Sequence, residues 1–145
     1  MRRLLFTTLL GIAISASTAF AVDKVWSIPG VINSGGLATV FSCTNGNATP
    51  ATVIVNLRDN SGTNAANVSS GLAANDAMID FATQSVAMLS GETVIPGAPT
   101  LVSGSAAITA TSGVYCTAYV VDSTNNPPSV AWPLTIVSKT KQKGD

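Results

Sequence analysis

The sequence predicts an all-β protein built as a single β-sandwich of about seven strands. Three observations lead to this fold class. Short segments alternate apolar and polar residues with the period of a strand that buries one face. Clusters of Asn, Asp, Ser, Gly and Pro separate these segments at short intervals, as turns do. Charged residues make up only 10% of the 145-residue chain, and a composition of small, β-branched and amide side chains suits short strands joined by polar turns.

The first segment, MRRLLFTTLLGIAISASTAFA (residues 1–21), predicts a secretory signal peptide. Two arginines precede an apolar run from Leu4 to about Ile14, and the Ala-Phe-Ala pattern that ends at Ala21 is typical of a cleavage site. A membrane anchor is the alternative, but a span needs roughly 20 strongly apolar residues, and hydroxyl side chains interrupt the second half of this run. We therefore expect an extracytoplasmic protein, periplasmic or secreted, with no membrane span after cleavage at Ala21.

Residues 22–138 are expected to form the sandwich domain, because a mature chain of this length has the usual size of one domain. The segments predicted to contain strands are KVWSI, ATVFSC, ATVIVNLRD, SVAMLSGETVI, SAAITAT, GVYCTAYVVD and SVAWPLTIV. SVAMLSGETVI is predicted to form two strands about a turn at Ser90-Gly91. The side chains expected to face the core in these segments are Thr39, Phe41, Cys43, Val53, Val55, Leu57, Val86, Met88, Ala106, Ile108, Ala110, Val130, Trp132, Leu134 and Ile136.

Three places in the chain need a separate interpretation. The alanine-rich stretch from Ala65 to Ala82 fits neither period, so we expect a long loop with a helical turn there. Pro133 lacks an N–H donor, which places the last strand at a sheet edge or at a bulge. Residues 139–145 are expected to be a flexible polar tail, and its lysines (Lys139, Lys141 and Lys143) fit a solvated terminus better than a binding site.

The charge of the mature chain limits its partners. Loss of Arg2 and Arg3 with the signal peptide leaves five basic against seven acidic residues, since the whole chain has seven of each. A net charge of about minus two argues against nucleic acid as a partner. An unpaired edge strand can accept another chain, so we expect a protein partner or self-association through edge strands.

The two cysteines are expected to form one inter-strand disulfide. Cys43 lies in ATVFSC on the same face as Phe41, and Cys116 lies in GVYCTAYVVD on the same face as Val114 and Ala118. In an exported chain, two cysteines that face the core most simply join to each other. A redox or metal-binding thiol pair is the alternative, but the chain has no CxxC spacing and no histidine.

The placement of one cysteine on an early strand and one on a late strand resembles the inter-sheet bridge of immunoglobulin-like domains. More closely, GSAAITATSGVYCTAYVVD together with LSGETVI is similar to small secreted bacterial immunoglobulin-like β-sandwich proteins of uncharacterised function. In these proteins a Gly-x-Ala-x-Ile strand precedes a Cys-x-Ala-x-Val strand. The resemblance implies an immunoglobulin-like β-sandwich and an exported bacterial protein, and it implies no activity.

The sequence contains few candidate catalytic or metal-binding residues. The absence of histidine excludes Ser-His and Cys-His catalysis and most transition-metal sites, so we expect no catalytic residue, metal or cofactor. Asp76 and Asp80 would share one face of a helix and offer an acid–base pair, although solvated loop carboxylates are the simpler interpretation. The stretch DNSGTN (residues 59–64) has oxygen ligands at alternate positions but lacks the further acidic ligands of an EF-hand loop, so we expect a hairpin turn.

Tyr115 and Tyr119 lie on the strand face opposite Cys116. They either pack under a covering loop or line an exposed patch for contact with a ligand or partner. The leading hypothesis is a non-enzymatic extracytoplasmic structural or protein-interaction module, such as a component of a surface assembly. The alternative is a small periplasmic or secreted binding protein that holds an apolar or carbohydrate ligand near these tyrosines. A hydrolase that uses Asp76 and Asp80 comes third.

Overall fold

The computed structural model describes residues 24–139, so the expected signal peptide (1–21) and the tail residues 140–145, with Lys141 and Lys143, lie outside the described residues. The described chain confirms the all-β prediction and contains no helix, hence none that is long and apolar enough to cross a membrane. Its strands are β1 (Lys24–Ser34), β2 (Leu37–Asn45), β3 (Ala51–Arg58), β4 (Asn64–Leu72), β5 (Met78–Ala82), β6 (Thr93–Val94), β7 (Leu101–Ala110), β8 (Val114–Asp122), β9 (Ala131–Pro133) and β10 (Val137–Lys139).

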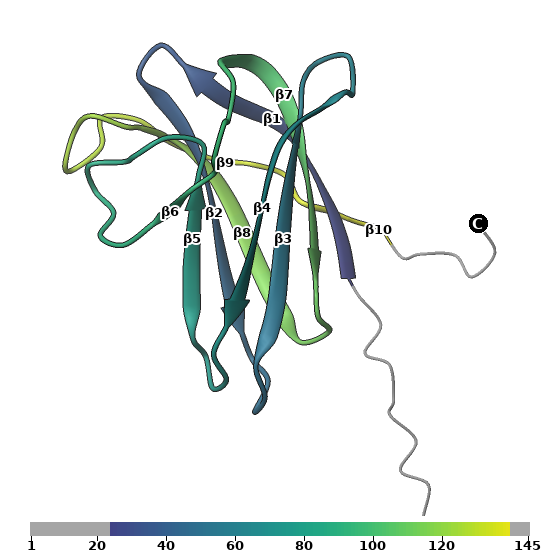
Figure 1. Cartoon of the computed structure of the whole chain (residues 1–145). Coiled ribbons are helices and arrows are strands. Elements are labelled where there is room, and N and C mark those ends of the chain that lie inside the picture. Colours follow the sequence, from purple (N-terminus) through teal and green to yellow (C-terminus); the bar gives the residue numbers. More distant parts are fainter. Residues whose placement is uncertain (1–23, 140–145) are drawn as a thin grey trace, which may run out of the picture.

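These strands form one mixed ten-stranded sheet that curls into a half-barrel (Figure 1). We call its two sides the first wall, in the order β4-β3-β7-β1, and the second wall, in the order β8-β2-β5-β6. The walls join where the ends of β1 and β2 pair. The two residues of that hairpin turn, Gly35 and Gly36, both have positive φ (61° and 77°), a conformation that favours glycine in a two-residue turn between strands.

The core lies between the two walls and follows the predicted alternation. Val53, Val55 and Leu57 of β3 are fully buried, whereas Thr52 and Arg58 on the same strand are exposed. The inward side chains of β7 and β2 are buried in the same way, as predicted from the period of two. The largest fully buried side chains of this core are Phe41, Phe81, Ile28, Leu57, Ile95 and Ile108.

The predicted strand at residues 85–90 is wrong, because this segment is a loop that covers the outer face of the second wall. Val86 is buried against Ala38, Val40 and Val121, which lie on that outer face. The part of β2 from Ala38 to Phe41 is therefore buried on both faces. The apolar alternation that suggested a strand reflects side chains that point down onto a sheet from a covering loop.

The expected long loop with a helical turn between Ala65 and Ala82 is also wrong. Most of this stretch forms β4 and β5, which a short turn connects. β4 pairs with β3 along its whole length, and β5 pairs with β2. Ala, Asn and Ser have weak strand propensity, so tertiary pairing determines the structure of this segment.

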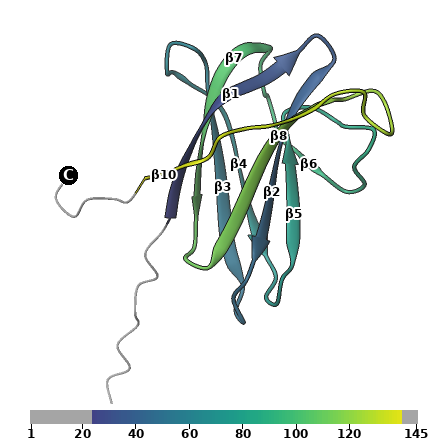
Figure 2. The same cartoon turned by 180° about the vertical axis from the view of Figure 1, so that it is seen from behind.

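The last predicted strand is split in two, and we call residues 131–139 the C-terminal strap. Its first part, β9, pairs with β8 on the second wall, and its second part, β10, pairs with β1 on the first wall. The strap therefore crosses from one wall to the other (Figure 2). Leu134 and Ile136 are half-buried against the core, but Trp132 is 54% exposed, which corrects the prediction that it faces inward. The edge position predicted for Pro133 is confirmed, since β9 pairs with β8 alone.

Candidate interaction site

The predicted disulfide is confirmed: Cys43 and Cys116 are joined, with Cα atoms 4.1 Å apart. They lie directly opposite each other on β2 and β8, which are neighbouring strands of the second wall. The bridge therefore fastens two adjacent strands of one wall, whereas the bridge of immunoglobulin-like domains joins two sheets. No thiol is free among the described residues.

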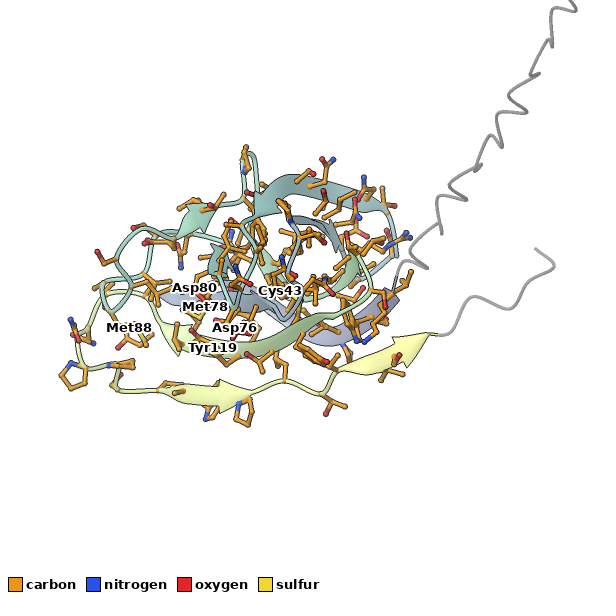
Figure 3. All side chains as sticks on the ribbon, turned by 90° about the horizontal axis from the view of Figure 1, so that it is seen from below. Cys43, Asp76, Met78, Asp80, Met88 and Tyr119 are labelled. Atoms are coloured by element: carbon orange, nitrogen blue, oxygen red, sulfur yellow. A yellow bond between two sulfur atoms is a disulfide. The ribbon has the colours of Figure 1, made fainter. Side chains whose placement is uncertain are left out.

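The two tyrosines share one face of β8 but differ in their surroundings. Both lie on the outer face of β8, about 13 Å apart along the strand. Tyr119 is half-buried and packs against the same outer-face cluster as Met88 of the covering loop (Figure 3). Tyr115 is 65% exposed, and the Lys24 Nζ atom lies 5.2 Å from the centre of its ring. The two rings thus have different surroundings, and Tyr115 is the more exposed of the two.

The acidic residues considered for catalysis lie on different kinds of structure, and no helix holds them on one face. Asp76 lies in the turn before β5 with a φ of 62°, and its N–H donates to the Asn45 carbonyl at 2.8 Å. Asp80 lies on the outer face of β5, where the Ser42 hydroxyl donates to its carboxylate. Residues 24–139 contain no group of three or more His, Cys, Asp and Glu side chains that could hold a metal ion.

The DNSGTN stretch forms the turn between β3 and β4. The Asp59 Oδ1 atom accepts hydrogen bonds from the Ser61 hydroxyl (2.6 Å) and from the N–H groups of Ser61 and Thr63 (2.9 Å each). These bonds, led by that of the Ser61 hydroxyl, lower the pKa of Asp59 from its ordinary value of 3.8. One of its carboxylate oxygens is thus engaged within the turn itself, as in an Asx turn.

The hollows on the first wall lack the features of a ligand-binding site. One, of about 350 Å³, lies between the β3–β4 turn and residues 100–103 at the start of β7. Another, of about 370 Å³, lies over the start of β1 beside Arg58. Binding sites usually combine an enclosed apolar cavity with a few convergent polar groups, and neither hollow has this combination.

The edges of the two walls differ in how they are covered. β10 pairs with β1 at one side of the first wall, and β9 and β6 pair with the outer strands β8 and β5 of the second wall. β4 has β3 as its only paired strand among the described residues. We call the side of β4 that faces away from β3 the open edge. It is the one outer edge in this range without even a short covering strand.

The open edge lacks the features that usually protect an edge strand. Natural sheets blunt such edges with charged residues, proline or bulges. β4 reads NAANVSSGL, with no charged residue and no proline, and its pairing with β3 is regular except for one irregularity beside Arg58. Ala66 and Val68 face inward, opposite the buried Leu57 and Val55, yet both remain only half-buried. The core is therefore less well covered along β4 than along β3.

The sequence did not identify this site, although it predicted adhesive edge strands in general. The signal was weak because β4 consists mainly of alanine, asparagine and serine, which are not strand markers. The lack of charge and proline over nine residues was visible, but it became meaningful only once the pairing order was known. Comparison with protein-family models, with curated proteins and with solved structures finds no match to this chain.

Proposed function

We propose that this chain is a non-enzymatic, extracytoplasmic structural or protein-interaction module that binds a partner by strand addition to its open edge. The observation that carries the proposal is the uncharged nine-residue edge of β4, which no strand within residues 24–139 covers, whereas β9 and β6 cover parts of the outer strands β8 and β5. The location outside the cytosol is supported by the disulfide, since such bonds persist in oxidising compartments. It is also supported by the signal-peptide pattern of residues 1–21.

Strand addition suits the chemistry of this edge. Roughly half of the backbone N–H and C=O groups of β4 point away from β3, because the groups of a strand alternate between its two sides. An added strand would satisfy them and would gain affinity from main-chain bonds. It would also cover the half-buried side chains Ala66 and Val68.

We further propose that the half-barrel is an immunoglobulin-like β-sandwich. Two facing walls with an apolar core between them support this assignment. The position of the disulfide, within one wall, departs from the immunoglobulin pattern. This proposal about the fold implies no activity.

A ligand-binding function is the second candidate, and the observation that favours it is the exposure of Tyr115. Met78 lies across Thr44 from Tyr115 in the register of the second wall, and both Met78 and Tyr115 are 65% exposed. An aromatic ring beside apolar and hydroxyl groups is suited to stacking against a sugar. Replacement Tyr115→Ala should abolish oligosaccharide binding measured by calorimetry, and a wild-type protein that binds no oligosaccharide removes this candidate.

The interaction proposal is tested by amide hydrogen exchange of the full-length protein. In dilute solution, the β4 amides that point away from β3 should exchange fast, while those of β3 stay protected on both sides. Addition of an extracytoplasmic extract from the producing cells should slow exchange in β4 and leave the other strands unchanged. The double substitution Asn67→Lys with Ser69→Lys should prevent this protection. β4 amides that never become protected, with extract or with concentrated protein, would show that the proposal is wrong.

A further inference from the structure

We propose that the strand added to the open edge is β4 of a second copy of this chain, in antiparallel orientation. The two first walls would then form one continuous sheet across a two-fold axis. This inference rests on the proposed function, because it takes the open edge as the site of strand addition. It adds the identity and the orientation of the partner.

The absence of charge in β4 favours a partner identical to itself. When a strand pairs with its own copy about a two-fold axis, the central residue meets its own copy, and the residues on either side of it meet each other. A charge at the centre, or like charges on both of its neighbours, would therefore face a like charge, which destabilises a sheet. β4 has no charged residue among its nine positions. A strand that recognised a different, charged partner would profit from complementary charge, and β4 offers none.

The pattern of faces in β4 also fits self-pairing. Residues directly opposite each other in an antiparallel pair point to the same face, so the inner side chains of one copy meet the inner side chains of the other. The register centred on Val68 places Ala66 opposite Ser70, and the irregularity beside Arg58 lies outside these central positions. Val68 then lies opposite its own copy on the inner face, and the exposed Asn67 lies opposite Ser69 on the outer face.

This register covers what the single copy leaves exposed. Val68 and Ala66 are half-buried on the inner face because no strand of the described residues lies beyond them. In the pair, Val68 packs against its own copy and Ala66 against Ser70. On the outer face, the amide of Asn67 can donate to the hydroxyl of Ser69. At the centre of the joined edge, Val68 on the inner face and the pair of Asn67 and Ser69 on the outer face thus find partners of matching polarity without any charged group.

The geometry is tested by cysteine cross-linking in the full chain. In the proposed register, the two copies of position 68 lie about 4.5 to 5.5 Å apart between Cα atoms, which is within the range of a disulfide. Val68→Cys should therefore give a covalent dimer on mild oxidation, seen on a non-reducing gel. Asn64→Cys is the matched control on the same strand, because its two copies would lie about 26 Å apart, and it should stay monomeric.

Light scattering as a function of concentration provides the second readout. The wild type should dimerise, and Asn67→Lys with Ser69→Lys should raise the dissociation constant about tenfold or more, since two like-charge pairs would meet across the axis. Thr52→Lys with Asn56→Lys, on the outer face of the paired strand β3, should leave dimerisation unchanged.

The outcomes separate this inference from the proposed function. A wild type that stays monomeric at millimolar concentration, or a dimer that the β4 lysines do not weaken, overturns the second copy as partner. Equal cross-linking of Val68→Cys and Asn64→Cys also overturns it. If β4 amides become protected with the cell extract but not with concentrated protein, strand addition stands and the self-pairing inference fails. If they become protected in neither, both fail.

Discussion

Asn45 at the end of β2 shows how one buried polar side chain organises the turns at this end of the half-barrel. Its Nδ2 group donates to the carbonyls of Thr49 (2.9 Å) and Ala73 (2.8 Å). Its Oδ1 atom accepts from the N–H of Asn47 (3.0 Å) and from the Asn47 amide (2.9 Å). Asn45 is fully buried, so every polar atom of its side chain is satisfied without solvent.

We predict that Asn45→Ala lowers the free energy of unfolding by about 3 kcal/mol, because it leaves two carbonyls and the Asn47 groups with fewer partners in a buried place. Denaturant unfolding monitored by tryptophan fluorescence measures this change. Asn64→Ala is the control, since Asn64 is exposed, and its effect should stay within about 0.5 kcal/mol. Equal effects of the two substitutions would mean that the Asn45 network adds nothing to stability.

Asp122 at the end of β8 holds the loop that leads to the strap. Its carboxylate accepts hydrogen bonds from the Ser129 hydroxyl (2.6 Å), the Thr124 N–H (2.9 Å) and hydroxyl (2.8 Å), and the Asn125 amide. The Ser129 bond contributes most, and together these donors hold the pKa of Asp122 far below its ordinary value of 3.8. The folded state therefore favours the ionised carboxylate.

The sign of the pH dependence follows from this lowered pKa. The contribution of Asp122 to stability is fully present above its unfolded pKa of 3.8 and is lost as the pH falls toward the folded value. We predict that Asp122→Asn destabilises the protein at neutral pH and weakens the loss of stability below about pH 4. Some acid dependence should remain, because hydrogen bonds also lower the pKa values of Asp59 and Glu92. Denaturant midpoints across this pH range measure both effects, and an unaltered acid dependence would contradict the assignment.

At the scale of the element, prediction from sequence worked where a strand has one buried and one exposed face. β3 and the central part of β7 were found because Val, Ile and Leu alternate there with polar residues. β4 was missed because an edge strand with one neighbour needs little apolar surface, and alanine and serine suffice. Residues 85–90 were misassigned because a covering loop also points every second side chain toward the protein.

The strap is the element whose stability should be the most local. Leu134 is half-buried against the core, and its N–H donates to the Ala118 carbonyl at 2.8 Å. We predict that Leu134→Ala lowers the free energy of unfolding by about 1–2 kcal/mol, less than at a fully buried site. Amide exchange in β9 and β10 should rise more than exchange in β3 and β7. Thr135→Ala, an exposed neighbour, is the control, and a uniform rise over all strands would contradict a local role for the strap.

At the scale of the whole molecule, the open edge could not be located from sequence because strand order depends on distant pairings. β3 pairs with β7, and β2 pairs with β8, across long stretches of chain. Local patterns give the strands but not their neighbours, so they do not reveal which strand ends a wall. The disulfide could be predicted, since it required only two core-facing cysteines, but its position within one wall depended on the same unknown order.

The disulfide closes a loop of 73 residues that contains β3 to β7. By the chain-entropy model, such a closure stabilises the folded state by roughly 4 kcal/mol, because it restricts the unfolded chain. β2 and β8 are already paired along their length, so the bond is not needed to define the fold. We therefore predict that Cys43→Ala with Cys116→Ala lowers the thermal midpoint strongly while the far-ultraviolet spectrum stays that of a β protein. Reduction of the wild type should lower the thermal midpoint by the same amount. A thermal midpoint that neither the substitutions nor reduction changes would show that the disulfide does not stabilise the folded state.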